Sequence, residues 1–188
     1  MSSAGWDERF RAGDHADSQP DSFLIAAREW LDLVEPGAAA LDLACGAGRH
    51  AVWLAEQGFQ VTAVDSSAAA LERVRRLAAE RGVTVCCRRL DLESPGIDLG
   101  QQTYSLVCGF FFLHRPLFPA LRAALRPGGL VIYKTYTVDQ LRCPGGPRRP
   151  AHLLEHNELL RLLAGFRVLS YEERWQGRGT AAIVAQKP

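Results

Sequence analysis

The segment "LDLACGAGR", residues 41–49, combines residue types that could bind a ligand. An apolar run reaches Asp42, and Gly46 and Gly48 follow before Arg49. Glycine permits a positive φ and lets a ligand approach bare backbone. A helix that starts here would also offer unpaired N–H groups at its first turn. The spacing therefore predicts a ligand-binding loop between a buried strand and a helix.

Two ligand classes fit this loop. A dinucleotide would place its pyrophosphate at the helix N-terminus, with "GAGRHA" as the fingerprint and Asp65 as the ribose-binding acid about 20 residues on. A positively charged nucleoside would instead favour carboxylates around the loop. Asp42 lies within the loop motif, and Asp91 ends a later apolar run in "RRLDLE". A carboxylate repels a pyrophosphate and attracts a cation, so these acids favour the nucleoside.

The elements that would position these residues alternate along the chain. Apolar runs predict strands at 38–45, 59–65, 83–92, 104–114 and 130–138, and helical periodicity predicts helices at 20–34, 49–58, 67–82, 116–129 and 153–166. Two last runs, 167–175 and 180–187, are typical of an antiparallel pair. Alternating strands and helices predict a parallel sheet covered on both faces. In such sheets ligands bind beyond the carboxyl ends of the strands, where the strand order reverses.

Composition limits the function classes. The chain has 188 residues, enough for one domain, and a formal net charge of +1, which gives no general attraction to nucleic acid or membrane. It has no apolar run long enough to span a membrane, and its first residues do not resemble a signal peptide. The five cysteines lack a C-x-x-C pair and indicate small buried side chains in a reducing cytoplasm, with no metal site.

Four motifs, "LDLACGAGR", "VTAVDSS", "LDL" and "LRPGGLVIY", resemble in order and spacing those of the class I S-adenosylmethionine-dependent methyltransferases. The resemblance covers residues 20–188 and implies a Rossmann-like, doubly wound sheet of seven mostly parallel strands, with helices on both faces and the last strand antiparallel. It implies S-adenosylmethionine as cofactor. The binding residues carried over are Asp42, Ala44, Gly46 and Gly48 at the methionine end, Asp65 and Ser66 at the ribose, and Asp91 and Leu92 at the adenine. Ala44 replaces a glycine frequent in the family.

Each of these residues also has a purely structural interpretation. Asp65 and Asp91 could cap the segments that follow them, and Asp42 could pair with Arg49. Gly46 and Gly48 could serve only a tight turn. These alternatives remain open at the level of sequence.

The segment "GWDERFRAGDH" resembles the N-terminal arm of small methyltransferases of the tellurite-resistance and thiopurine type. This resemblance implies that residues 1–19 form an arm over the cofactor site, with Trp6 and Phe10 closing the pocket, ahead of a methyltransferase domain at 20–188. An aromatic face near the sulfonium would add cation–π attraction. The alternative is a tail that does not pack.

The acceptor side is expected after the fourth and fifth predicted strands. Phe110 would touch the cofactor, whereas Phe111, Tyr136, Arg148, Arg149 and His152 would bind an anionic or polarisable acceptor, since guanidinium groups match oxyanions. His114 and His152 are the candidate bases, although each could be structural and the basic loop could simply be solvated. No N-P-P-Y or D-P-P-Y tetrapeptide follows the fourth strand, which argues against methylation of the amino groups of nucleic acid bases.

The sequence thus predicts in-line methyl transfer to a small molecule, such as a tellurite- or selenite-type oxyanion or a thiol. A soft nucleophile of this kind needs little or no general base. Two alternatives remain: an NAD-dependent oxidoreductase and a non-catalytic S-adenosylmethionine-binding domain. The expected assembly is a monomer or a homodimer, with no nucleic-acid partner.

Overall fold

The structure is a computed structural model that describes residues 3–13 and 19–188. Within these residues the chain forms a seven-stranded sheet in the order β3-β2-β1-β4-β5-β7-β6. The strands are β1 (Ala39–Leu43), β2 (Gln60–Asp65), β3 (Val85–Arg89), β4 (Tyr104–Phe110), β5 (Leu125–Tyr136), β6 (Arg167–Arg174) and β7 (Thr180–Gln186). The five strands from β3 to β5 pair in parallel, and β7 is antiparallel to both of its neighbours. This topology confirms the predicted fold class.

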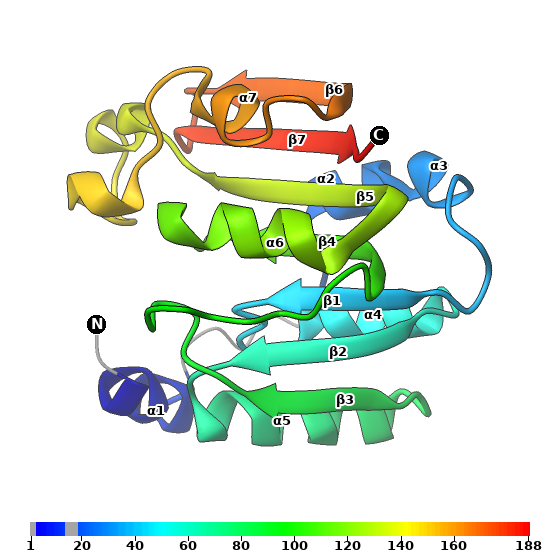
Figure 1. The fold of residues 1–188 in the computed structure, drawn as a ribbon. Coiled ribbons are helices and arrows are strands. Elements are labelled where there is room, and N and C mark those ends of the chain that lie inside the picture. Colours follow the sequence, from blue (N-terminus) through cyan, green and yellow to red (C-terminus); the bar gives the residue numbers. More distant parts are fainter. Residues whose placement is uncertain (1–2, 14–18) are drawn as a thin grey trace.

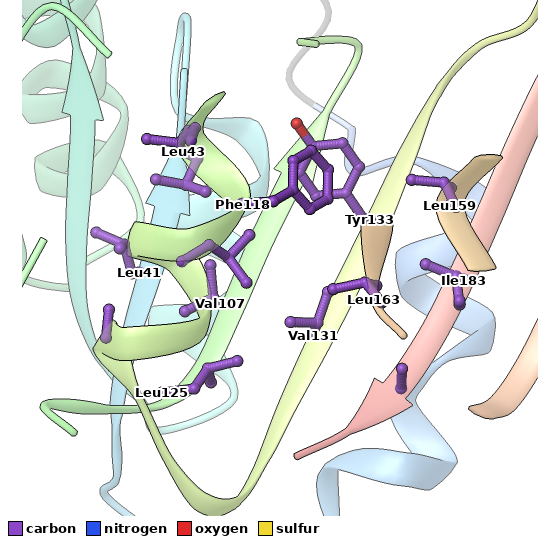
Figure 2. Close-up of a cluster of buried hydrophobic side chains, with 14 of the residues drawn as sticks. Leu41, Leu43, Val107, Phe118, Leu125, Val131, Tyr133, Leu159, Leu163 and Ile183 are labelled. Atoms are coloured by element: carbon purple, nitrogen blue, oxygen red, sulfur yellow. The ribbon is translucent and has the colours of Figure 1, made fainter. Parts of the chain in front are cut away.

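Helices cover both faces of the sheet (Figure 1). On one face lie α2 (Ser22–Ala26), α3 (Arg28–Leu31), α4 (Arg49–Glu56) and α5 (Ala68–Glu80), and on the other lie α6 (Phe118–Ala124) and α7 (Glu158–Leu162). Side chains of β1 alternate between two cores. Leu41 and Leu43 pack in the core beneath α6 and α7, whereas Ala40 packs in the core beneath α4. Figure 2 shows the first of these cores.

Local sequence explains why α4 and α5 begin where they do. The Ser67 hydroxyl caps α5 by accepting the Ala70 N–H at 3.0 Å. Gly48, with φ +86°, begins α4 directly after β1. The first turns of both helices therefore lie at the carboxyl ends of the parallel strands. The order of strands reverses between β1 and β4, which places the topological switch point at the same edge.

Three predicted elements differ from those observed. The expected helix at 20–34 is divided into α2 and α3, because the turns that follow Ala27 close with i→i+3 bonds in place of i→i+4 bonds. The expected helix at 153–166 shortens to α7, because Leu154 instead forms a β-bridge with Thr137, and Asn157 adopts φ +59°. The Pro-Gly-Gly segment was expected at the end of the helix at 116–129. It lies instead inside β5, where the register with β4 shifts.

The described part of the expected N-terminal arm forms α1 (Ser3–Arg11), which lies at the carboxyl edge of the sheet beside α5 (Figure 1). The Asp7 carboxylate accepts the Ser67 hydroxyl at 2.5 Å and the Ala69 N–H at 3.2 Å. Residues 1–2 and 14–18 of the arm expected at 1–19 lie outside the described residues. No helix within 3–13 or 19–188 is both long and apolar enough to cross a membrane.

Candidate functional site

A cavity of about 570 Å³ opens at the carboxyl edge of the sheet, over the switch point. This volume is within the range of small-molecule and cofactor sites. Its walls come from α1, the loop after β1, the ends of β2 and β4, the segment after β3, the end of β5 and the β6–β7 turn. The lining residues are Trp6, Phe10, Ala44, Cys45, Gly46, Ala47, Arg49, His50, Asp65, Ser66, Leu90, Asp91, Leu92, Glu93, Phe110, Phe111, Phe112, Tyr136 and Arg178.

The loop after β1 adopts positive φ values at Ala44 (+52°), Gly46 (+54°) and Gly48 (+86°). Gly46 lines the cavity, and a Cβ atom there would lie 3.4 Å from the ring of Phe10. Gly48 does not line it. A Cβ atom at Gly48 would lie 2.7 Å from a methyl group of Val74 in α5, so this glycine serves the packing of the loop against α5. The methyl group of Ala44 is accommodated despite its backbone conformation.

Asp65, at the end of β2, is the most constrained acid of the cavity wall. Its Oδ2 accepts the Gly46 N–H and its Oδ1 accepts the Ser67 N–H, both at 2.9 Å. Burial raises the pKa of Asp65, and the hydrogen bonds from Ser67 and Gly46 oppose this rise. The carboxylate therefore has the structural role that the sequence left open, and Asp65 also lines the cavity, where ligand binding was the alternative.

Two further acids continue this side of the wall. Asp91 accepts the Glu93 N–H at 3.0 Å, which fixes a turn after β3, and both side chains line the cavity. Leu92, between them in the sequence, also lines the cavity but is buried in the core. Together with Asp65, these residues give the cavity one acidic side, which would oppose a pyrophosphate and favour a cation.

Asp42 is not part of the cavity wall. It lies on the α4 side of β1, only 1% exposed, and its Oδ1 accepts the Cys108 thiol at 3.3 Å. Its Oδ2 has no hydrogen-bond partner in the described part of the chain. Burial raises the pKa of Asp42 to about 7. The structure thus places this acid beneath the loop, where it can influence a ligand only through the charge and shape of the loop.

Aromatic residues form the wall opposite the acids. Phe110 stacks on His50 with ring centroids 4.1 Å apart, and Phe111 lies 5.2 Å from Tyr136. Phe111 adopts φ +58°, which is unusual for a bulky residue, and its N–H donates to the Lys134 carbonyl at 2.7 Å. Such strain persists only where the surroundings fix the conformation, and it is concentrated at functional sites.

The α1 side of the cavity is aromatic as well. Phe10 is buried over the Gly46 loop, and Trp6 lies beside it at a centroid distance of 6.1 Å. The Phe10 carbonyl accepts a hydrogen bond of 3.2 Å from the Arg73 guanidinium, and this bond adds a second link between α1 and α5. Trp6 and Phe10 of the described part of the arm therefore line the cavity.

The structure does not bring the expected basic loop to the cavity. Arg148 donates to the carbonyls of Leu141 (2.7 Å) and Cys143 (2.9 Å), so it holds its own loop together. The neighbouring 3₁₀ turn (Pro150–His152) is anchored by Arg115, which donates to the carbonyls of Ala151 and Leu153. Arg149, His152 and His114 likewise do not line the cavity.

Three polar residues that the sequence did not single out do line it: His50, Glu93 and Arg178. Arg178 lies in the "QGRG" turn between β6 and β7. No local pattern marks it, because only the antiparallel return of β7 beside β5 brings this turn to the carboxyl edge. His50 lies in the first turn of α4, directly after the glycine loop, and its sequence position did not distinguish it from the other residues of that helix.

Comparisons with known proteins agree with this geometry. A family model described as "Methyltransferase domain" matches residues 40–129. The chain is 31% identical over 141 residues to thiopurine S-methyltransferase of Bordetella petrii, covering 68% of this chain and 62% of that protein. It is 29% identical over 159 residues to hemagglutinin 1 of Eikenella corrodens, covering 79% of this chain and 50% of that protein. The chain thus spans between half and somewhat under two thirds of the length of these two relatives.

Two solved structures have the same fold. The S-adenosylmethionine-dependent methyltransferase from Mesorhizobium loti matches with a TM-score of 0.74 at 22% identity, over 91% of this chain and all of that one. TehB from Haemophilus influenzae matches with a TM-score of 0.73 at 18% identity, over 97% of this chain and 67% of that one. Shorter sequence matches, over 39% and 33% of this chain, are to ribosomal RNA methyltransferases. The family match, the relatives and the fold together confirm the resemblance to the class I S-adenosylmethionine-dependent methyltransferases that the sequence motifs indicated.

Proposed function

We propose that the chain transfers a methyl group from S-adenosylmethionine to a small, soft acceptor that carries negative charge. The observation that carries this proposal is the division of one cavity into an acidic side, formed by Asp65, Asp91 and Glu93, and an aromatic side that ends at Arg178. A cationic nucleoside suits the first side, and an anionic acceptor suits the second.

The residues present fit the cofactor of the family. The Gly46 N–H, which a pyrophosphate would need, already donates to the Asp65 carboxylate, so the loop favours a ligand without phosphate. Asp65 and Ser66 would hold the ribose hydroxyls. Asp91 and Leu92 would frame the adenine, since a carboxylate can accept a hydrogen bond from an exocyclic amine.

The remaining wall residues divide between the two reactants. Ala44 and Gly46 would face the methionine end of the cofactor, with Asp42 and Gly48 supporting the loop from behind. Trp6 and Phe110 would exclude water around the sulfonium. Phe111 and Tyr136 would shape the acceptor subsite.

When bound, S-adenosylmethionine supplies an electrophilic methyl group attached to a positively charged sulfur. The part of the chain that the structure describes would mainly align the acceptor with it, which can contribute on the order of 7–11 kcal/mol. The histidine of the cavity wall, His50, accepts the Asp21 N–H at its Nε2, so this nitrogen is not available as a base. A thiolate or a chalcogen oxyanion needs no base, and the geometry favours these acceptors over a neutral hydroxyl.

Arg178, rather than Arg148, Arg149 or His152, is the basic residue we assign to acceptor binding, because it is the one of the four that lines the cavity. The thiopurine enzyme among the relatives and the cavity's volume support a small-molecule acceptor. A cytoplasmic location is also part of the proposal, supported by the free thiols of the buried Cys45 and Cys108.

The proposal is tested by incubating the protein with S-adenosylmethionine and a panel of tellurite, selenite, aromatic thiols and hydroxyl compounds, and by measuring release of S-adenosylhomocysteine. We expect release with a thiol or a chalcogen oxyanion. Calorimetry with S-adenosylhomocysteine and fluorescence with NADH separate the alternatives. Binding of NADH alone would contradict the proposal, and binding of S-adenosylhomocysteine without turnover of any acceptor would favour a non-catalytic binding domain.

A further inference from the structure

Asp21 connects three elements behind the aromatic wall. Its backbone N–H donates to Nε2 of His50 in α4 at 3.2 Å, and its Oδ1 accepts the Phe23 N–H at 2.9 Å, which caps α2. The same Oδ1 accepts the Lys134 ammonium of β5 at 2.8 Å, across 113 residues of sequence. Neither side chain of this ion pair is more than 13% exposed.

Both partners of Asp21 contact the wall of the cavity directly. His50 stacks on Phe110, and the Lys134 ammonium lies 5.8 Å from the ring centroid of Phe111. Lys134 is also the register partner of Phe110 in the sheet, and its carbonyl accepts the Phe111 N–H. The pair is therefore adjacent to Phe110, beside which the sulfonium would lie, and to Phe111, where the acceptor subsite would begin.

The charge balance at this wall depends on Asp21. Burial tends to raise the pKa of Asp21, but the bonds from Lys134 and Phe23 keep it below its ordinary value, so the carboxylate is ionised at neutral pH. Arg49 is a second cation near the wall, at 6.0 Å from the Phe111 ring centroid. Without the Asp21 charge, Lys134 would be a largely buried cation that has lost its ion-pair partner, beside a subsite that must accept another cation.

We infer that Asp21 is a positioning residue of the cofactor site, which neutralises Lys134 behind Phe110 and Phe111 so that a positively charged sulfonium can bind there. This inference rests on the proposed function, because it concerns the same cavity and cofactor. The neutralisation of Lys134 would make the site selective for charge. It would strengthen binding of the positively charged sulfonium of S-adenosylmethionine and would have little effect on binding of the neutral thioether of S-adenosylhomocysteine.

The experiment measures the dissociation constants of both ligands by calorimetry for the wild type, Asp21→Asn, Lys134→Met and the double variant. Asparagine keeps the helix cap and the backbone N–H to His50, so Asp21→Asn removes mainly the charge. We expect Asp21→Asn to weaken S-adenosylmethionine about tenfold and S-adenosylhomocysteine less than about twofold, because only the former carries a charge near Lys134. The double variant removes the unpaired cation and should restore the wild-type ratio of the two constants.

Glu72→Gln is the matched control, since it removes one carboxylate from the exposed Arg75–Glu72 pair on α5 and should change neither constant. Circular dichroism checks that each variant is folded. Equal weakening of both ligands by Asp21→Asn, or no recovery in the double variant, would overturn the inference and leave the proposed function intact. A wild-type protein that binds neither ligand would overturn both.

Discussion

Gly46 donates its backbone N–H to Oδ2 of Asp65 at 2.9 Å, although the two residues are 19 positions apart in the sequence. The bond joins the loop after β1 to the end of β2, and Asp65 completes the junction by accepting the Ser67 N–H. One carboxylate thus shapes the glycine loop, supports the start of α5 and faces the cavity. We therefore expect ligand binding and the stability of this edge of the sheet to depend on the same residue.

Replacement of Asp65 by alanine should affect both properties. The Gly46 and Ser67 N–H groups would lose their acceptor, at a cost of about 1–3 kcal/mol for an unsatisfied buried donor. Affinity for S-adenosylhomocysteine should fall at least about tenfold, as expected for losing a hydrogen bond to the ribose made by a charged group. Thermal unfolding and calorimetry measure the two effects. Asp91→Asn serves as the comparison, and it should reduce affinity with little change in stability, because Asp91 bonds only its own turn.

Gly48→Ala should destabilise the protein more than Gly46→Ala. At Gly48 the new methyl group would lie 2.7 Å from Val74, at a φ of +86°, whereas at Gly46 the nearest atom is the ring of Phe10 at 3.4 Å. We expect a loss of about 1–3 kcal/mol for Gly48→Ala, from overpacking and backbone strain. Urea unfolding tests this, and combination with Val74→Ala should recover part of the loss. An additive effect of the two substitutions would show that the contact with Val74 is not the cause.

The buried Asp42 should make stability depend on pH. Burial raises its pKa from an ordinary 3.8 to about 7, so the folded protein holds this proton more tightly than the unfolded chain. The bound proton contributes its full stabilisation of the folded protein below the ordinary pKa of 3.8. This stabilisation decreases as the pH rises between the two pKa values and is lost above about pH 7. Wild type should therefore lose stability relative to Asp42→Asn as the pH rises from about 4 to about 7. Melting temperatures of the two proteins measure the difference, and parallel curves would contradict the assignment.

Arg178→Gln and Arg148→Gln should have different effects. Arg178 lines the cavity, so its replacement should raise the acceptor KM about tenfold or more and leave the affinity for S-adenosylhomocysteine unchanged. Arg148 bonds the carbonyls of its own loop, so its replacement should reduce the protection of residues 141–143 from proteolysis or hydrogen exchange and leave KM unchanged. Steady-state kinetics with the best acceptor of the panel decides between them. An increase in KM for Arg148→Gln alone would restore the prediction made from the sequence.

Local patterns determined the fold and the acidic side of the cavity. Alternating strand and helix periodicities specify a doubly wound sheet, and the glycines and the acids at the strand ends lie at positions that this topology brings to one edge. Strands whose carboxyl ends meet there end at or shortly before these residues, so their place could be predicted without knowing any tertiary contact: Asp65, Ser66, Asp91, Leu92 and Phe110.

The tertiary structure alone decided the rest. Strand alternation turned Asp42 toward the α4 core, and the loop that carries Arg148, Arg149 and His152 folded on itself instead of over the cavity. Arg178 lines the cavity because β7 returns antiparallel beside β5, and Asp21 binds Lys134, which is 113 residues away in the sequence. Such contacts depend on how loops and distant elements pack, and no short-range pattern in the sequence encodes them, because their free energy comes from groups that meet only in the folded chain.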